Sequence, residues 1–318
     1  MFKKARIKIT AFYLVIIIAI IGVFSILLFY YAAQHIRDNI EVTGDEQQNA
    51  IVENTIDQMQ GAIAFADLII IIISGFISYW LSGKTLKPIR TALEAQEQFS
   101  ANASHELRTP LSVMKTNLEV FLRNEKTSAE EIKNIARSNL EEINYMSSMI
   151  ENLLALARSK KIDTTIEFEE VSVSKTINSV IKRLKKEAEE KHLSLLLEEK
   201  DNSLVYGNER MLEQAFFNII NNAISYTKSG TIKINTYSIK NKVIIEVKDT
   251  GIGIAKENID KIFEPFYKID TSRNVRSGSV GLGLAIVKEI IKKHKGLIKI
   301  KSEVGKGTIV TVEMPKYI

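Results

Sequence analysis

Apolar residues gather in two long stretches near the start of the chain, with a polar segment between them. Residues 11–31 carry no charged side chain, and residues 62–83 carry one acid, Asp67, near their beginning. Each stretch is long enough to cross the hydrocarbon core of a bilayer as a helix, so the pattern predicts two transmembrane helices. A cleaved signal peptide is the alternative for the first stretch, but its apolar run is long for one and no A-x-A site follows it.

Two further segments show apolar residues at helical spacing. The first runs from Ile89 to about Arg123 and the second from Ser128 to Arg158, and a short polar joint connects them. Because two antiparallel helices with one apolar stripe each cannot enclose a core, residues 84–161 predict a four-helix bundle made by two copies of the chain. The alternative is a helical hairpin that packs on its own C-terminal domain.

Residues 162–318 alternate between strand-like and helix-like patterns. Every second residue is apolar in runs such as Val243, Ile245 and Val247, which is typical of antiparallel strands covered on one face. The pattern predicts an α+β sandwich, so the whole chain is expected to be a multi-domain membrane protein. The predicted strands are 166–170, 193–197, 231–238, 243–249, 297–302 and 308–313, and the predicted helices are 173–191, 208–227 and 283–294.

Charge and composition indicate the orientation of the chain in the membrane and exclude several kinds of site. Basic residues flank the apolar stretches in residues 1–10 and from Lys84 onward, whereas residues 32–61 hold six acids against Arg37 alone. Because basic flanks favour the cytoplasmic side, we predict a multi-pass protein of the cell membrane with both termini cytoplasmic and residues 32–61 outside. The net charge of +5 combines 1 − 6 = −5 in the segment between the apolar stretches with 5 − (−5) = +10 elsewhere. This basic excess suits anionic lipid or nucleotide phosphates better than DNA, so no direct nucleic-acid partner is expected. The 318 residues contain no cysteine, which excludes a disulfide framework, a thiolate zinc site and cysteine catalysis.

The first candidate for chemistry is His105, in the run SHELRTPL within the helix predicted from Ile89. The apolar residues of this run are expected to face the core, which leaves His105 exposed, with Glu106 beside it and Thr109 one turn further on. A neutral imidazole is a good nucleophile near pH 7, and an adjacent carboxylate can take its proton. A solvated surface pair is the alternative.

A group of asparagines in the helix predicted at 208–227 is the second candidate. Asn218 and Asn222 are four residues apart, so their amides lie one above the other on one face. Neutral amide oxygens suit a magnesium ion that also binds nucleotide phosphates. Asparagine is a poor helix former, so the group calls for a functional reason; an exposed polar face is the alternative.

Two glycine-containing loops complete the candidates. Asp249-Thr-Gly251-Ile-Gly253 follows an apolar strand, and its carboxylate can accept a hydrogen bond from the amino group of a base; a hairpin turn is the alternative. A second loop opens a helix, where amide groups and the helix dipole can hold phosphates. A Rossmann dinucleotide site is disfavoured there, because the loop does not begin a βαβ unit. The glycines of this second loop are Gly278, Gly281 and Gly283.

Taken in order, these motifs resemble those of bacterial two-component sensor histidine kinases. The His105 run, the asparagines, the Asp249 loop, Phe263-Glu-Pro-Phe266 and the glycine loop follow one another at compatible spacing after the two apolar stretches. The resemblance covers roughly residues 95–315. It implies a phosphoacceptor domain of the HisKA type, a dimeric four-helix bundle, followed by an ATP-binding domain of the GHKL or Bergerat fold. It also implies a homodimeric, ATP- and Mg²⁺-dependent kinase that phosphorylates His105 and passes the phosphoryl group to an aspartate of a response regulator.

The same resemblance implies a role for each site residue. Glu106 would assist His105, and Thr109 would help to orient water for dephosphorylation of the partner. Asn218 and Asn222 would hold magnesium and the ATP phosphates. Asp249 would accept from the adenine amino group, and Gly251 and Gly253 would shape the pocket beside it. Phe266 would anchor a mobile lid whose glycines, Gly278, Gly281 and Gly283, close over the triphosphate. Lys268 would contact a phosphate. Lys268 stands where the family often has an arginine.

Some features depart from the family's pattern. Ser279 and Val280 stand where the lid commonly has Gly and Ser or Thr, and Ser225 stands where Lys is common. No HAMP-like signal converter separates the second apolar stretch from His105, so that stretch is expected to run almost directly into the His105 helix. Another ATPase of the same fold and a pseudokinase that has lost phosphoryl transfer are the alternatives.

Overall fold

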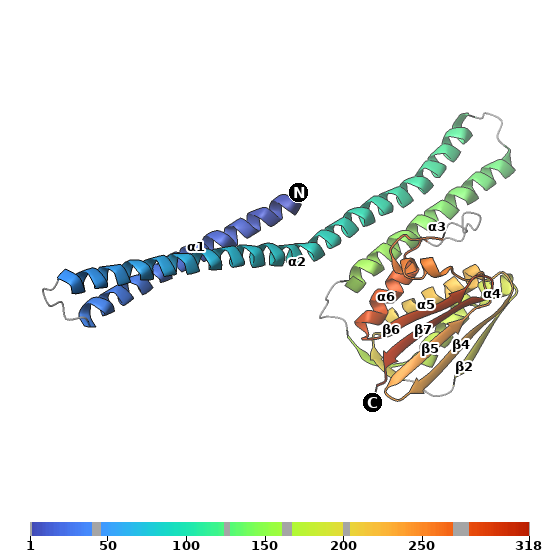
Figure 1. Cartoon of the computed structure of the whole chain (residues 1–318). Helices are drawn as coiled ribbons and strands as arrows, with labels where there is room; N and C mark the ends of the chain where they lie inside the picture. The colour runs from blue at the N-terminus through green and yellow to red at the C-terminus, as the bar shows by residue number, and fades with distance from the viewer. Residues whose placement is uncertain are drawn as a thin grey trace. The chain divides into compact units, whose positions relative to one another are not determined.

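The computed structural model describes residues 2–39, 46–123, 128–160, 167–199, 204–269 and 280–317. They divide into two compact units, Met1–Gln98 and Phe99–Ile318. The first unit contains helix α1 (Phe2–Asn39) and the first part of helix α2 (Glu46–Arg123), which we call the N-terminal hairpin. Figure 1 shows these elements in blue and cyan.

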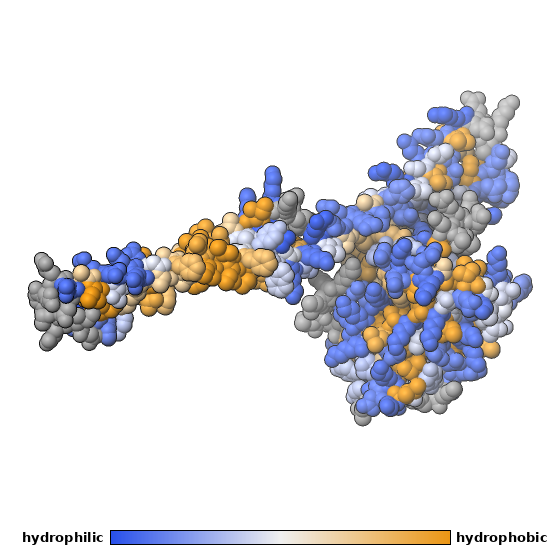
Figure 2. Space-filling view, viewed as in Figure 1, coloured by the Kyte–Doolittle hydropathy of each residue, from blue (hydrophilic) through white to orange (hydrophobic). Residues whose placement is uncertain are grey.

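Polar contacts join the two helices of the N-terminal hairpin. The Arg6 guanidinium donates to the carbonyl oxygen of Tyr79 over 2.8 Å and lies 3.6 Å from the centre of the tyrosine ring. The Ser25 hydroxyl donates to the Asp67 carboxylate over 2.8 Å. Between these contacts the surface is apolar, and Figure 2 shows it as an orange belt. Both helices are long and apolar enough to cross a membrane by length and composition.

Helix α2 continues unbroken from the second apolar stretch through His105, as expected where no signal converter intervenes. Helix α3 (Ala129–Lys160) follows it, so the two helices predicted for this region are confirmed. A capping box begins α3: the Ser128 hydroxyl accepts from the amide of Glu131 over 3.2 Å, and the Glu131 carboxylate accepts from the amide of Ser128 over 2.8 Å. The joint at 124–127 lies outside the described residues.

Residues 167–317, which we call the sheet domain, form a five-stranded sheet covered by three helices on one face (Figure 1), which confirms the predicted α+β layers. In spatial order the strands are β2 (Leu193–Glu199), β4 (Gly230–Ile239), β5 (Lys242–Lys248), β7 (Gly307–Pro315) and β6 (Leu297–Glu303). The helices are α4 (Val173–Glu190), α5 (Glu209–Tyr226) and α6 (Gly283–Lys293).

The structure corrects three points of the sequence-based prediction. Strand β2 pairs with β4 in parallel, not antiparallel, because the connection between them contains α5 and a helical crossover returns the chain to the same end of the sheet. Strand β3 (Leu204–Gly207) was not predicted, since four residues are too few to show alternation; it pairs with β1 (Glu169–Ser172) in a separate sheet. The start of the strand predicted at 166–170 lies outside the described residues. The short helices η1 (Lys256–Asn258) and η2 (Lys261–Phe263) were also not predicted.

The core of the sheet domain lies between the sheet and the helices. Helix α5 contributes apolar residues at helical spacing, Phe216, Ile219, Ile220 and Ile224, each at most 1% exposed. A hydrogen bond from the amide of Met211 to the Asn208 side chain caps its first turn over 3.0 Å. Because the apolar face of α5 is fixed against the sheet, its other face, which carries the asparagines, is held in one orientation.

Candidate functional site

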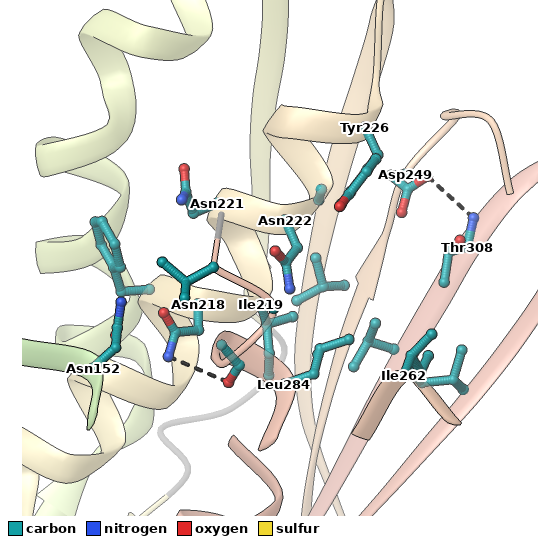
Figure 3. Close-up of a pocket in the computed structure, with 18 of the residues that line it drawn as sticks. Asn152, Asn218, Ile219, Asn221, Asn222, Tyr226, Asp249, Ile262, Leu284 and Thr308 are labelled. Carbon is teal, nitrogen blue, oxygen red and sulfur yellow. Dashed lines mark hydrogen bonds between the residues drawn. The ribbon is translucent and has the colours of Figure 1, made fainter. Parts of the chain in front are cut away.

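A cavity of about 550 Å³ opens in the second unit, beside the polar face of α5. Its walls come from α3, α4 and α5, from the ends of β5 and β7, and from the residues on both sides of 270–279. Figure 3 shows the asparagines of α5 on one side of this space and Asp249 with Thr308 on another. The cavity thus brings together residues that are distant in the sequence.

The polar face of α5 contributes a continuous stripe to the cavity wall. Arg210, Gln214, Asn218 and Asn222 follow one another at intervals of four residues, and all of them line the cavity. The Asn218 amide nitrogen donates to the carbonyl of Gly283 over 3.4 Å, which leaves its oxygen as an acceptor (Figure 3). The Asn221 side-chain oxygen is buried and has no hydrogen-bond partner among the described residues. Such an unsatisfied oxygen in a polar cavity fits a site that holds a cation or a hydrated ligand.

Asp249 lies at the end of β5 and is held by backbone groups. Its Oδ1 accepts from the amide of Gly251 over 2.8 Å and from that of Thr308 over 3.1 Å (Figure 3). Burial raises the pKa of the Asp249 carboxyl above its ordinary value, and the two amide hydrogen bonds offset only part of this rise. The carboxylate is therefore fixed in direction at the cavity wall.

The turn after Asp249 requires glycine at position 253. Gly253 has a φ of +71°, a conformation that side chains with a Cβ rarely adopt. A Cβ at this position would also collide with the carbonyl of Glu303. The close packing of this turn on the β6 end explains why the backbone can lie so near the cavity.

The glycine loop contacts the segment before residue 270 through its backbone. The amide of Phe266 donates to the carbonyl of Gly281 over 2.9 Å, and Phe266 has a φ of +66° while Gly281 has a φ of +75°. Gly281, Gly283 and Lys268 line the cavity, but Phe266 packs against the core beside it. Gly278 and Ser279 lie outside the described residues. Val280, one of the departures from the family's pattern, is buried and lines the cavity.

Glu106 binds side chains from two other segments of the second unit. Its Oε2 accepts from the hydroxyl of Tyr145 on α3 over 3.0 Å and from the ammonium of Lys268 over 2.9 Å. Burial together with the Glu106 charge raises the pKa of Tyr145 strongly, so this phenol stays protonated as a donor. Glu106 is thereby tied both to α3 and to the sheet domain.

His105 is exposed on α2, as predicted. One turn further on, the Thr109 hydroxyl donates to the backbone carbonyl of His105 over 3.2 Å. The exposed ring of His105 is accessible to a ligand from solvent. The geometry therefore combines a polar cavity and an exposed histidine in one compact unit.

Comparisons with known proteins relate both regions to families. Residues 207–318 match the histidine kinase-, DNA gyrase B- and HSP90-like ATPases, a description that also covers enzymes without a phosphoacceptor histidine. Residues 95–161 match the His Kinase A (phospho-acceptor) domain. This second match distinguishes histidine kinases from the other ATPases that share the first description. The chain belongs to the sensor histidine kinases. The rival assignment to another ATPase of the same fold is thereby set aside.

Individual relatives of this histidine kinase agree with the assignment. The sensor histidine kinase RppB of Synechocystis is 33% identical over 76% of the chain and 54% of its own length. The structure of the Acinetobacter baumannii histidine kinase AdeS matches with a TM-score of 0.55 and 26% identity, over 67% of the chain and 98% of AdeS. Full-length ShkA in complex with AMPPNP matches with a TM-score of 0.52 and 25% identity, over 69% of the chain and 46% of ShkA. The chain spans about half the length of the curated relatives it matches.

The sequence motifs of this histidine kinase fall into two groups in space. Asn218, Asn222 and Asp249 lie together around the cavity, whereas His105 and Thr109 lie on the exposed side of α2. Sequence reasoning missed Arg210 and Gln214, although extending the four-residue spacing back from Asn218 would have found them. It also missed Tyr145, which carries no signal in the sequence because its contact with Glu106 depends on how α2 and α3 pack.

Proposed function

We propose that this protein is a membrane-bound sensor kinase that transfers the γ-phosphoryl group of ATP to His105. The observation that carries the proposal is the cavity lined by Asn218, Asn222 and Asp249, which lies in the same compact unit as the exposed His105. The matches to a phosphoacceptor domain and to an ATPase family support it. The structure of ShkA with AMPPNP supports nucleotide binding in this fold.

In the proposed complex the adenine lies at Asp249 and the phosphates lie at the asparagines of α5. Asp249, with Oδ1 held by two amides, offers Oδ2 to the adenine amino group, and Gly251 and Gly253 shape the pocket beside it. The phosphates extend toward the stripe of Asn218 and Asn222, where the amide oxygens suit Mg²⁺. When bound, Mg²⁺ supplies positive charge that neutralises the phosphate oxygens. Gly281 and Gly283 then border the triphosphate, the Phe266 amide holds the Gly281 carbonyl, and Lys268 contacts a phosphate.

The transfer itself needs little from the protein beyond positioning. A ring nitrogen of His105 attacks the γ-phosphorus, so that an N–P bond forms while the bond to the leaving ADP oxygen breaks. Glu106 accepts the proton that the imidazole loses. The phosphoryl group then passes to an aspartate of a response regulator. We expect Thr109, one turn from His105, to help orient water when the regulator is dephosphorylated.

The decisive experiment uses the full chain in bilayer nanodiscs with Mg²⁺ and ATP labelled on its γ-phosphate. We expect acid-labile, alkali-stable label on the wild type and none on His105→Gln. His35→Gln is the matched control and should keep the label. Asn222→Ala and Asp249→Ala should lose it together with nucleotide binding. Nucleotide binding without any label on the wild type would instead identify a scaffold that has lost phosphoryl transfer.

Transfer to a partner is tested from the labelled protein. After free ATP is removed, purified receiver domains from the same genome are added and the label is followed. We expect it to move to one receiver domain in seconds to minutes and to be lost when the acceptor aspartate of that domain is changed to Asn. Label that stays on His105 with every receiver domain would contradict a two-component role.

The exposed apolar belt supports the placement of α1 and α2 in a membrane. The basic residues in 1–10 and from Lys84 onward support the cytoplasmic position of both termini. The chain has no cysteine, so single introduced cysteines report topology directly. We expect a membrane-impermeant maleimide to label Glu53→Cys in intact cells and Ser128→Cys only after lysis. Labelling of Ser128→Cys in intact cells would contradict this orientation.

The hairpin of α2 and α3 leaves apolar residues exposed that a second copy of the chain would cover, including Leu111, Leu118, Leu140 and Ile143. In one chain Leu111 is 57% exposed, so the predicted core of the bundle needs a partner. We expect a dimer of the full chain by sedimentation in detergent. We expect Leu140→Glu to shift it toward monomer, and a wild-type monomer would contradict the proposed bundle.

A further inference from the structure

The segment 263–269 of the sheet domain contacts one face of α2 at two points. The rings of Phe266 and Phe99 lie 5.4 Å apart, and the Lys268 ammonium lies 2.9 Å from the Glu106 carboxylate. Phe99 and Glu106 are seven residues apart, about two helical turns, so they lie on the same face of α2. The hydrogen bond from Phe266 to Gly281 fixes the backbone between these contacts. The ion pair is therefore part of a defined docking contact.

Lys268 also lines the nucleotide cavity, so one ammonium group borders two anionic sites. One site is the Glu106 carboxylate, and the other is the proposed position of the ATP phosphates. The ion pair is partly exposed, with 34% of the lysine and 28% of the glutamate side chain accessible, so it is weak enough to exchange. A triphosphate carries more negative charge than one carboxylate and attracts the ammonium more strongly.

Glu106 keeps a second contact if Lys268 leaves. The Tyr145 hydroxyl donates to the same oxygen, Oε2, from α3. Both donors bind the same carboxylate oxygen, but only Lys268 forms a charged pair with it. Loss of Lys268 alone would free the Glu106 carboxylate from its charged partner while Tyr145 still holds it in position.

We propose that Glu106 and the bound nucleotide compete for Lys268, so that nucleotide binding releases Glu106 to serve as the base for His105. The inference rests on the proposed function. Lys268 then links occupancy of the cavity to the release of Glu106 beside His105. Tyr145 is a positioning residue for Glu106. In the absence of nucleotide, the contact of Phe266 with Phe99 supports the ion pair, and Glu106 stays bound to Lys268.

The test measures nucleotide affinity, which does not depend on turnover. The full chain in nanodiscs is titrated with Mg²⁺ and AMPPNP, and binding is followed by calorimetry. Because Glu106→Gln removes the competitor for Lys268, we expect it to tighten AMPPNP binding about two- to fivefold, the range for a partly exposed ion pair. Lys268→Ala should weaken binding. In the Lys268→Ala background, Glu106→Gln should have no further effect.

Two controls separate competition from other causes. Lys268→Arg keeps the charge and should preserve the tightening by Glu106→Gln, and Tyr145→Phe keeps the ion pair and should leave affinity unchanged. Equal tightening by Glu106→Gln with and without Lys268 would show direct repulsion between Glu106 and the phosphates and overturn the proposal. An unchanged affinity in Glu106→Gln would also overturn it. A wild type that binds no AMPPNP would remove the proposed function as well, so the two failures are distinguishable.

Discussion

Isoleucine and leucine are abundant in both the N-terminal hairpin and the sheet domain, but their side chains meet different surroundings. Ile219 and Ile220 of α5 are each 1% exposed, whereas Ile20 and Ile26 of α1 are 64% and 70% exposed. Burial of apolar surface stabilises a fold by roughly 25 cal/mol per Å². The first pair therefore stabilises the sheet domain within a single chain, and the second pair gains nothing until an apolar medium surrounds it.

The comparison shows that hydropathy alone does not say where a core lies. In the sheet domain the apolar residues recur at intervals that match α5 and the strands, so that one face of each is buried. In α1 they occur all round the helix, which is typical of a helix surrounded by lipid. The sheet domain should fold on its own interactions, and the stability of the hairpin should depend on the bilayer.

The largest expected effect comes from removing a core aromatic residue. Phe216 is 1% exposed, so Phe216→Ala should lower the free energy of unfolding of the sheet domain by about 3–5 kcal/mol. Ile26→Ala, in the exposed belt of α1, is the matched control and should leave it unchanged. Hydrogen exchange of the α5 amides in the full chain measures both. Equal losses in the two variants would contradict a self-contained core in the sheet domain.

A smaller effect is expected at the glycines of the two regions. Gly253→Ala forces a Cβ into a left-handed backbone conformation and against the Glu303 carbonyl, which should cost about 1–3 kcal/mol and weaken nucleotide binding. Gly22→Ala, in α1, meets nothing within 4 Å and should be neutral or slightly stabilising. Thermal unfolding monitored by circular dichroism, together with AMPPNP titration, compares the pair. A harmless Gly253→Ala would show that the turn is less constrained than its geometry indicates.

Local patterns predicted most of the fold, and long-range pairing explains what they missed. The helices α3 to α6 and strands β4 to β7 lie close to the predicted ranges, because each carries enough residues to show its period. The parallel pairing of β2 with β4 was not predictable from alternation, because the described helices cover one face of this mixed sheet and its parallel strands alternate as its antiparallel ones do. Strand β3 has only four residues, and its partner lies more than thirty positions earlier in the chain.

The site shows the same division between local and long-range information. Asn218 and Asn222 were predictable as neighbours because they share one helix face. That Asp249 lies across the same cavity depends on the order of strands in the sheet. The contacts of Glu106 with Tyr145 and Lys268 join residues 39 and 162 positions apart, so no spacing rule predicts them. The roles assigned to these residues remain predictions for the experiments above.

The smallest effect is expected from pH, and it separates a buried carboxyl, Asp249, from a carboxyl that is paired with two lysines, Glu313. Burial raises the pKa of Asp249 above its ordinary value of 3.8, so between that value and the raised one the folded chain binds more protons than the unfolded chain. Stability from this group is therefore present at low pH and is lost as pH rises through that window. Nucleotide binding should change in the opposite direction, because the ionised carboxylate is the better acceptor for the adenine amino group.

Asp249→Asn should remove the contribution of this group to the pH dependence of stability and of nucleotide binding, since an amide does not titrate in this range. Glu313→Gln is the control: hydrogen bonds from Lys299 and Lys242 lower the pKa of the Glu313 carboxyl, so stability from this group is present above its ordinary value of 4.5 and lost on acidification. The pH dependence of stability from Glu313 therefore has the opposite sign to that from Asp249, and Glu313 does not line the cavity. Because the nucleotide phosphates also take up protons in this range, AMPPNP titrations between pH 4 and 7 should show an affinity loss on acidification in all three proteins. We expect this loss to be equal in wild type and Glu313→Gln and smaller in Asp249→Asn. If Asp249→Asn lost as much affinity as the wild type, Asp249 would not be the acceptor for the base.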